Sequence, residues 1–446
     1  MATTEADVKV SLKLIVNKEI KKVLFAEAKK DFVDILCSFL TLPLGTIARL
    51  VENESNMGPL PIGSLNSLYH SVAALDSRCL WAQENKEMVL RPRNTAQDFC
   101  KTLKINIDDT HHTKRFFSTG SFFKCSENEF NGFVNDATTF VITDDLILMP
   151  KSVDRTRLAQ LQDLGIEGPI SLKEMTVKVT KKKVLDLLKC SLLSKSCLTV
   201  LLQKKPRIQR PTFLSHSVEN TSGIKFNLKL FIRKSDGKVL YAQGGNEIAN
   251  MLLSFLTFPL GGVVRKLEGN SCVGSIDALY NSIVDMNENY FMSKSAKNRL
   301  VDPYLLLLMS LISFETSKTN DGNEKEPRMF VVTDDLVVTQ SSPTSDLNLD
   351  SSSLDLKEKV VAIGLVECLN ILKASLSSTS ALTIGLAHLL PEFIGCSSDI
   401  ACSPDIACSP DIACSSEGSD SACSSDGGYS SYDACSSDDA DSFVLI

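Results

Sequence analysis

Near its N-terminus the chain reads Val8-Lys9-Val10-Ser11-Leu12-Lys13-Leu14-Ile15-Val16, and this alternation of apolar and polar residues returns as Ile224-Lys225-Phe226-Asn227-Leu228-Lys229-Leu230-Phe231-Ile232. Two later segments are repeated as well. One reads Ser38-Phe-Leu-Thr-Leu-Pro-Leu-Gly45 and returns as Ser254-Phe-Leu-Thr-Phe-Pro-Leu-Gly261. The other reads Phe140-Val-Ile-Thr-Asp-Asp-Leu146 and returns as Phe330-Val-Val-Thr-Asp-Asp-Leu336. Three segments repeated in the same order indicate an internal duplication.

Each copy begins with a pattern that predicts a β-hairpin. Val10, Leu12 and Leu14 alternate with polar residues, which is typical of a strand with one buried face. Residues 23–25 provide the second strand of the first copy. In the second copy a clear turn, Ser235-Asp236-Gly237, separates the two strands.

Helices with one apolar face are predicted to follow each hairpin. The first stripe consists of Phe32, Ile35, Leu36, Phe39 and Leu40. The helix should end or kink at Pro43-Leu44-Gly45, because proline lacks a backbone donor and glycine permits left-handed geometry. Ser64 and Ser275 are predicted to cap the next helix of each copy. The third repeated segment predicts a strand pair, followed directly by another helix.

These patterns predict an α+β fold with two homologous lobes, each a β-hairpin plus packed helices and a later strand pair. We expect lobe one at residues 1–202, a polar linker at 203–223 and lobe two at 224–394. Residues 395–446 repeat Cys-Ser-Pro-Asp-Ile-Ala units and are rich in Cys, Ser and Asp. Too few large apolar residues occur there to offset the entropy of ordering, so we expect a disordered tail.

Composition limits the class of protein. The 446 residues are 43% hydrophobic and 23% charged, which is typical of a soluble globular protein. The net charge of −7 arises in the tail, which contains ten Asp and Glu and no Lys or Arg. No targeting segment is evident, and the most apolar run, residues 305–314, is about half the length of a membrane span. We therefore expect an intracellular protein, cytoplasmic or nuclear, whose fourteen cysteines are mainly thiols.

The repeated Lys-Val-Leu-Phe/Tyr-Ala, Leu-Pro-Leu-Gly and Val/Ile-Thr-Asp-Asp-Leu segments resemble a plant family catalogued as domain of unknown function 674. The resemblance covers about Val8 to Leu390 and leaves out the tail. It implies a plant origin and a duplicated unit, and it brings no established activity. Members of the family often have cysteine pairs in the region equivalent to residues 101–135, which suggests a metal knuckle. This chain has only Cys125 there.

The Asp pairs of the third repeat are the best candidates for a metal site. Asp144, Asp145, Asp334 and Asp335 each follow an apolar run, and carboxylate oxygens are the ligands that hard cations such as Mg²⁺ prefer. The competing interpretation is a tight turn between two strands, because Asp side chains readily bond the backbone of a turn. The second interpretation is favoured, since a structural turn explains the repetition at least as well.

Cysteine and histidine offer two weaker hypotheses. Cys100, His111, His112 and Cys125 could form a zinc set, but their spacing fits no finger. The six tail cysteines are spaced too widely for a metal-storage chain. No nucleotide-binding glycine motif and no nucleophile elbow occurs. We therefore expect no cofactor and identify no catalytic residue.

Lysines and arginines cluster at residues 181–183 and 204–210, but the nearly neutral body argues against strong phosphate binding. The favoured partner is a protein, and the oligomeric state stays open. Three functions remain. The first is a non-catalytic interaction module. The second is a divalent-metal-dependent enzyme or ligand-binding protein that uses the Asp pairs. The third is a thiol redox or metal-responsive protein. The lack of a catalytic constellation favours the first.

Overall fold

A computed structural model describes residues 8–53, 62–76, 83–110, 131–151, 171–202, 225–303, 329–341 and 355–391. They belong to one compact unit, residues 1–395. The expected linker, the apolar run 305–314 and the expected disordered tail lie outside the described residues. No described helix is both long and apolar enough to cross a bilayer.

The first sheet contains five antiparallel strands in the order β4-β3-β2-β1-β5. Their bounds are β1 (Val10–Asn17), β2 (Lys22–Ala28), β3 (Phe140–Thr143), β4 (Leu148–Pro150) and β5 (Leu172–Val179). On β1, Leu12 and Leu14 are fully buried, while Lys13 lies on the opposite face and pairs with acidic groups. The period-two pattern of the sequence therefore predicted which face packs against the helices.

The second sheet repeats this topology with the order β10-β6-β7-β8-β9. Its strands are β6 (Phe226–Arg233), β7 (Val239–Gly244), β8 (Phe330–Thr333), β9 (Val338–Gln340) and β10 (Leu356–Ile363). The predicted hairpins are β1–β2 and β6–β7, and the predicted later strand pairs are β3–β4 and β8–β9. The α+β fold with a duplicated unit is confirmed.

Strands β5 and β10 were not predicted, since a helix was expected directly after the strand pair. Both strands lie at the edge of their sheet, beside β1 and β6. Their sequences, LKEMTVKV and LKEKVVAI, mix charged residues into both faces. An edge strand needs little burial, so the alternation that marks the hairpin strands is weak here.

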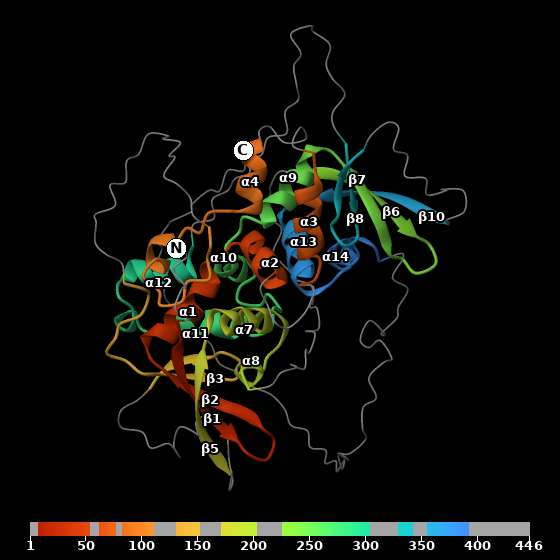
Figure 1. Cartoon of the computed structure of the whole chain (residues 1–446). Coiled ribbons are helices and arrows are strands. Elements are labelled where there is room, and N and C mark those ends of the chain that lie inside the picture. The colour runs from red at the N-terminus through yellow and green to blue at the C-terminus, as the bar shows by residue number, and fades with distance from the viewer. Residues whose placement is uncertain are drawn as a thin grey trace, which may run out of the picture. The chain divides into compact units, whose positions relative to one another are not determined.

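Helices fill the space between the two sheets (Figure 1). The first half contributes α1 (Lys30–Thr41), α2 (Leu44–Asn53), α3 (Leu65–Ala74), α4 (Gln83–Leu90), α5 (Gln97–Cys100), α7 (Lys181–Leu193) and α8 (Cys197–Val200). The predicted stripe of α1 is fully buried, and the break expected at Pro43 separates α1 from α2.

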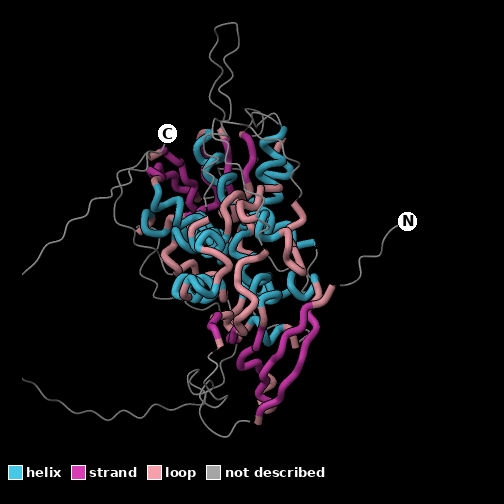
Figure 2. Tube along the Cα trace, turned by 90° about the vertical axis from the view of Figure 1, so that its left-hand side faces the viewer, coloured by secondary structure: helices cyan, strands magenta, loops and turns pink. Residues whose placement is uncertain are grey.

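The second half contributes α9 (Asn246–Phe255), α10 (Leu260–Lys266), α11 (Ile276–Asp285), the 3-10 turn η2 (Glu288–Tyr290), α12 (Lys294–Val301), α13 (Leu365–Ser377), α14 (Ala381–Gly385) and η4 (Ala387–Leu389). Figure 2 shows the strands at two opposite ends of the described body, with helices between them.

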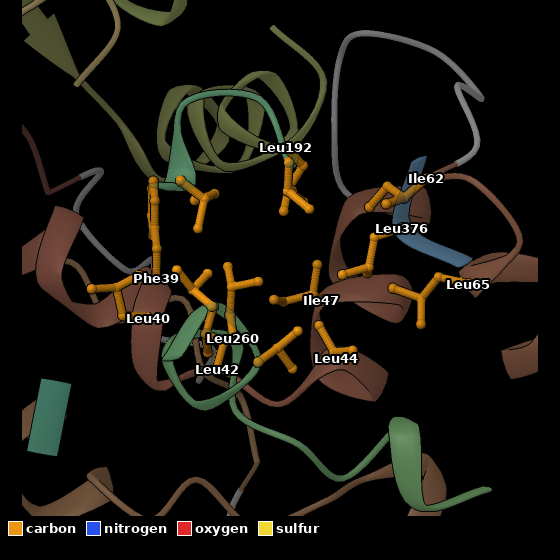
Figure 3. Close-up of a cluster of buried hydrophobic side chains, with 14 of the residues drawn as sticks. Phe39, Leu40, Leu42, Leu44, Ile47, Ile62, Leu65, Leu192, Leu260 and Leu376 are labelled. Atoms are coloured by element: carbon orange, nitrogen blue, oxygen red, sulfur yellow. The ribbon is translucent and has the colours of Figure 1, made fainter. Parts of the chain in front are cut away.

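Each half packs one helix against the sheet of the other half, and these two helices, α3 and α11, are called the exchanged helices below. Helix α3 of the first half contacts β9 and α9 of the second, and α11 of the second half contacts β4 of the first. The Ser64 amide donates to the Ser375 carbonyl at 2.8 Å, and the Ser275 amide donates to the Ser191 carbonyl at 2.8 Å. In Figure 3, Leu376 of α13 lies beside Ile62 and Leu65, which lead into α3.

The capping prediction for the two serines was right about position and wrong about bonding. Ser64 and Ser275 occupy the N-cap positions, but neither side chain bonds its own helix. The Ser64 hydroxyl donates to the Ser378 carbonyl at 2.7 Å, and the Ser275 hydroxyl donates to the Ser194 carbonyl at 2.8 Å. Because the exchanged helices bring these carbonyls close, the hydroxyls join the two halves of the molecule.

A second junction lies where the two Leu-Pro-Leu-Gly segments meet. Pro43 and Pro259 form an antiparallel bridge, with the Leu44 amide donating to Phe258 and the Leu260 amide donating to Leu42. Figure 3 shows Leu260 among side chains of the first half. The repeated motif therefore pairs with its own copy, and this explains why both copies need the same local geometry.

Candidate functional site

The Asp144–Asp145 pair lies in the turn between β3 and β4. The Asp144 carboxylate accepts two bonds from Thr199, at 2.8 Å from the amide and 2.9 Å from the hydroxyl. Its carbonyl accepts from the Cys197 amide at 2.7 Å. Asp145 accepts from the hydroxyl of Thr143, two residues before it. The two carboxylates thus serve different purposes, one holding the start of α8 and the other closing the turn.

The same arrangement recurs in the second half. Asp334 accepts from the Thr383 amide at 2.7 Å and from the Ala381 amide, through its carbonyl, at 2.8 Å. Asp335 accepts from the Thr333 hydroxyl at 2.5 Å. Lys238 lies 3.7 Å from the second carboxylate oxygen of Asp334. The pair therefore holds the start of α14 just as its counterpart holds α8.

Burial dominates the electrostatics of these turns. It raises the pKa of Asp144 and of Asp334 above the usual 3.8, although the bonds from Thr199 and Thr383 act in the opposite direction. The two pairs lie in different sheets, which Figure 1 shows at opposite ends of the helices. Within the part of the chain that the structure describes, no group of three or more acidic, histidine or cysteine side chains could hold a metal. Metal binding by these residues stays a prediction.

Of the four residues proposed to bind zinc, one lies within the described part of the structure. Cys100 is buried in α5, with its sulfur 3.7 Å from the Thr41 hydroxyl, and burial raises the pKa of its thiol to about 12. Residues 111, 112 and 125 lie outside the described residues. A thiol with this pKa is protonated at neutral pH, so the described environment suits a core position better than a ligand.

A buried ion pair that the sequence analysis did not identify clamps one loop of the first half. The Lys30 ammonium lies 2.8 Å from Asp34 and donates to the Val134 carbonyl, and Asp34 accepts from the Phe133 and Val134 amides at 2.8 and 2.9 Å. Val134 also bridges to Phe291 of the second half. An (i, i+4) Lys–Asp spacing on a helix was visible in the sequence, but its burial was not.

Among the described strands, β5 and β10 each have a neighbour on one side only, so each presents a row of backbone groups that can bind another strand. The Lys234 amide donates to the Asp355 carbonyl at 3.0 Å, which makes these two residues a hydrogen-bonded pair just before β10. Hydrogen-bonded and non-bonded pairs alternate along an antiparallel ladder. Every second residue of β10 therefore directs its amide and carbonyl away from β6, namely Leu356, Glu358, Val360 and Ala362.

The same reasoning applies to β5. The Lys18 amide donates to the Ser171 carbonyl at 2.9 Å, and the register with β1 continues without a bulge. The residues whose backbone groups point away from β1 are Leu172, Glu174, Thr176 and Lys178. Among the described strands, none lies beyond β5 or beyond β10.

On the outer face of sheet two, side chains of β6 and β7 pack beside this edge. Phe231 and Tyr241 stack with ring centroids 4.3 Å apart, and the Lys229 ammonium lies 5.0 Å from the Phe231 ring. On β10, which pairs with β6, Val360 is 63% exposed. An exposed β-branched residue between open backbone groups fits a surface that accepts another strand.

Comparison with known proteins identifies the family. A family model described as "Protein of unknown function (DUF674)" matches residues 6–132 and 123–321, which together make up more than half of the chain. The chain belongs to the DUF674 family. No curated protein and no solved structure matches it. The two matched regions agree with the duplication seen in this DUF674 protein, and the family description supplies no activity.

The sequence thus located the Asp turns of this DUF674 protein but missed its open edges. The turns could be predicted because the sequence Thr-Asp-Asp-Leu is identical in the two copies. The edge strands could have been found by aligning LKEMTVKV with LKEKVVAI, which share Leu-Lys-Glu and a valine at matched positions. Only the sheet order, however, reveals that each of these strands has a neighbour on one side alone among the described strands.

Proposed function

We propose that this DUF674 protein is a non-catalytic protein-interaction module, and that the edge strand β10 is its contact surface. The observation that carries the proposal is Val360, an exposed apolar residue at the centre of a strand whose outward backbone groups have no neighbouring strand among the described residues. A protein segment in extended conformation can add a sixth strand there, bonding the backbone and burying Val360.

The side chains beside the outward backbone groups define the partner. Three of them are apolar and one, Glu358, is acidic. In an antiparallel addition, a β-branched apolar residue of the partner would lie opposite Val360, and a basic residue two positions further along would lie opposite Glu358. Such a surface supports a protein partner over nucleic acid, which requires a concentration of positive charge along its phosphates.

The thiols support an intracellular location, cytoplasmic or nuclear, as part of the same proposal. All six described cysteines are free: Cys37, Cys100, Cys190, Cys197, Cys272 and Cys368. Proteins of oxidising compartments usually join such residues in disulfides, and reducing compartments keep them as thiols.

A peptide selection tests the proposal. The full chain is used to select binders from a displayed library of extended peptides, and each binder is then measured against Val360→Pro. Proline at this position removes an amide that points away from β6, so the β6–β10 ladder keeps its bonds. The matched control is Thr176→Pro, at the equivalent position of β5.

Support would be a set of peptides that carry the apolar and basic residues in the stated spacing, bind the wild type and the Thr176→Pro control equally, and bind Val360→Pro at least about tenfold more weakly. Amide hydrogen exchange at residues 356–363 should slow on binding. Failure to select any peptide, or equal affinity for Val360→Pro, would refute the proposed surface.

A further inference from the structure

The open edge of sheet one differs from that of sheet two in the side chains that would meet a partner. At the positions where β10 has Val360 and Ala362, β5 has Thr176 and Lys178. Both strands keep a glutamate two residues before this threonine or valine. The outward residues of β5 therefore include one acid and one base, spaced symmetrically about Thr176.

This spacing makes β5 complementary to itself. We propose that two copies of the chain pair through β5 in antiparallel orientation, with Thr176 opposite the partner's Thr176. Glu174 then lies opposite the partner's Lys178, and Lys178 opposite the partner's Glu174. Opposite charges and threonine pairs are both favourable when directly across from each other in an antiparallel sheet. One two-fold axis through the threonines creates both ion pairs at once.

The inner face agrees with the same register. Met175 and Val177 lie between the outward residues, on the face toward the helices, where they pack partly buried against the hydrophobic core. In the proposed dimer, Met175 lies opposite the partner's Val177 and Val177 opposite the partner's Met175. The pairing therefore extends the apolar face of one sheet into that of the other.

Other registers lose this match. A shift of two residues places Thr176 opposite the partner's Glu174 or the partner's Lys178, and both ion pairs disappear. A shift of four residues places glutamate opposite glutamate or lysine opposite lysine, which is unfavourable. A shift of the register by an odd number of residues would place residues whose backbone groups point toward the partner opposite residues whose backbone groups point toward β1. One register alone satisfies the backbone and both charges.

The strand is also shaped for pairing. The register between β5 and β1 has no bulge, and β5 contains no proline, so two common devices that protect an edge are missing from this described strand. On the outer face, Lys13 lies 3.1 Å from Glu174, and Lys178 donates to the Ser11 hydroxyl at 2.6 Å. Glu174 and Lys178 therefore share the outer face of the sheet, where a carboxylate can accept from a second cation and an ammonium can donate to a second acceptor.

The inference goes beyond the proposed function, and it uses the opposite sheet, so either can fail while the other stands. Sedimentation velocity on the full chain, from about 1 to 100 µM, tests the proposed dimer. An interface made by one pair of strands is small, so the dimer should dissociate at concentrations of about micromolar. Lys178→Glu and Glu174→Lys are prepared separately. Each single variant places like charges across the two-fold axis, so each should dimerise at least about tenfold more weakly than the wild type.

A mixture of the two variants provides the decisive measurement. A heterodimer of Lys178→Glu with Glu174→Lys has two acids facing two bases, so the mixture should recover dimer that neither variant forms alone. Recovery also shows that both variants are folded. The matched control is Ala362→Glu, the equivalent of Lys178→Glu in β10, which should dimerise like the wild type.

Three results would overturn the inference. The first is a wild type that stays monomeric up to about 100 µM. The second is a mixture of the two variants that dimerises no better than the variants alone. The third is a series of species larger than a dimer that Ala362→Glu abolishes, since pairing of β5 with β10 would form an open chain of molecules.

Discussion

Replacing Gly274 with alanine should destabilise the protein because this glycine lies where the exchanged helix α11 meets α7. Its φ angle is +47°, in the left-handed region that favours glycine. A Cβ atom here would collide with the Ser191 carbonyl oxygen and lie 2.8 Å from the Leu192 carbonyl carbon, where ordinary contact begins at 3.4 Å. The Ser191 carbonyl cannot easily move, because it accepts the Ser275 amide at 2.8 Å.

Two costs add together in this variant. Left-handed geometry costs an alanine roughly 1–2 kcal/mol relative to glycine. Forcing an extra carbon into a packed junction costs about 1–3 kcal/mol more. The free energy of unfolding should therefore fall by about 2–5 kcal/mol. At about 2 °C per kcal/mol, the value suited to larger domains, the thermal midpoint should fall by about 4–10 °C.

Thermal unfolding followed by circular dichroism measures the effect, with two companion variants. Gly63→Ala is the counterpart in the other half: its φ is +48°, and its Cβ would collide with the Ser375 carbonyl oxygen and lie 2.9 Å from the Leu376 carbonyl carbon. Gly245→Ala is the matched control. Its backbone is extended, and the nearest atom, 2.5 Å away, is the mobile end of the Glu247 side chain.

The expected order is clear. Gly63→Ala and Gly274→Ala should both melt well below the wild type, while Gly245→Ala should stay within about 1 °C of it. If the two junction variants melt with the control, helices α3 and α11 do not pack across the halves as described. The reasoning from helix exchange would then be wrong.

Three further predictions concern buried polar groups. Burial raises the pKa of Asp144 above the usual 3.8, so the folded protein binds the proton of this carboxyl group more tightly than the unfolded chain does. The stabilisation that results from this proton is complete below pH 3.8 and is lost as the pH rises through the pKa of the folded state. Asp144→Asn should therefore make the thermal midpoint depend less steeply on pH between 3.8 and the pKa of the folded state. The same pH dependence in the variant and the wild type would contradict the raised pKa of Asp144. Lys30→Met should cost about 3–5 kcal/mol in urea unfolding, because it leaves the buried Asp34 carboxylate without its cation, and adding Asp34→Leu should restore part of the loss. Ser275→Ala should cost about 1 kcal/mol by the same assay, through loss of its bond across the halves, and a neutral result would show that this bond contributes nothing.

Local pattern was enough to predict the hairpins, the first helices and the Asp turns. The alternation around Leu12 and the stripe around Phe39 each lie within one element, so neighbouring residues carry the whole signal. The turn interpretation of Asp144 rests on the same principle, since Asp145 bonds Thr143 two residues away. The other bonds of Asp144, to Thr199, join residues far apart in the sequence and were not predictable from pattern.

By itself, the sequence determined that the protein is a duplicated α+β unit, because repeated segments and short-range periodicity need no knowledge of distant contacts. Tertiary structure alone decided that α3 and α11 exchange places, that Ser64 bonds Ser378 instead of its own helix, and that β5 and β10 are the edge strands among the described residues. Each of these features depends on which backbone comes to lie beside which, and identical local patterns fit either half of a duplicated chain. The edges, and with them both proposed binding surfaces, therefore emerge only when the strands are placed in order.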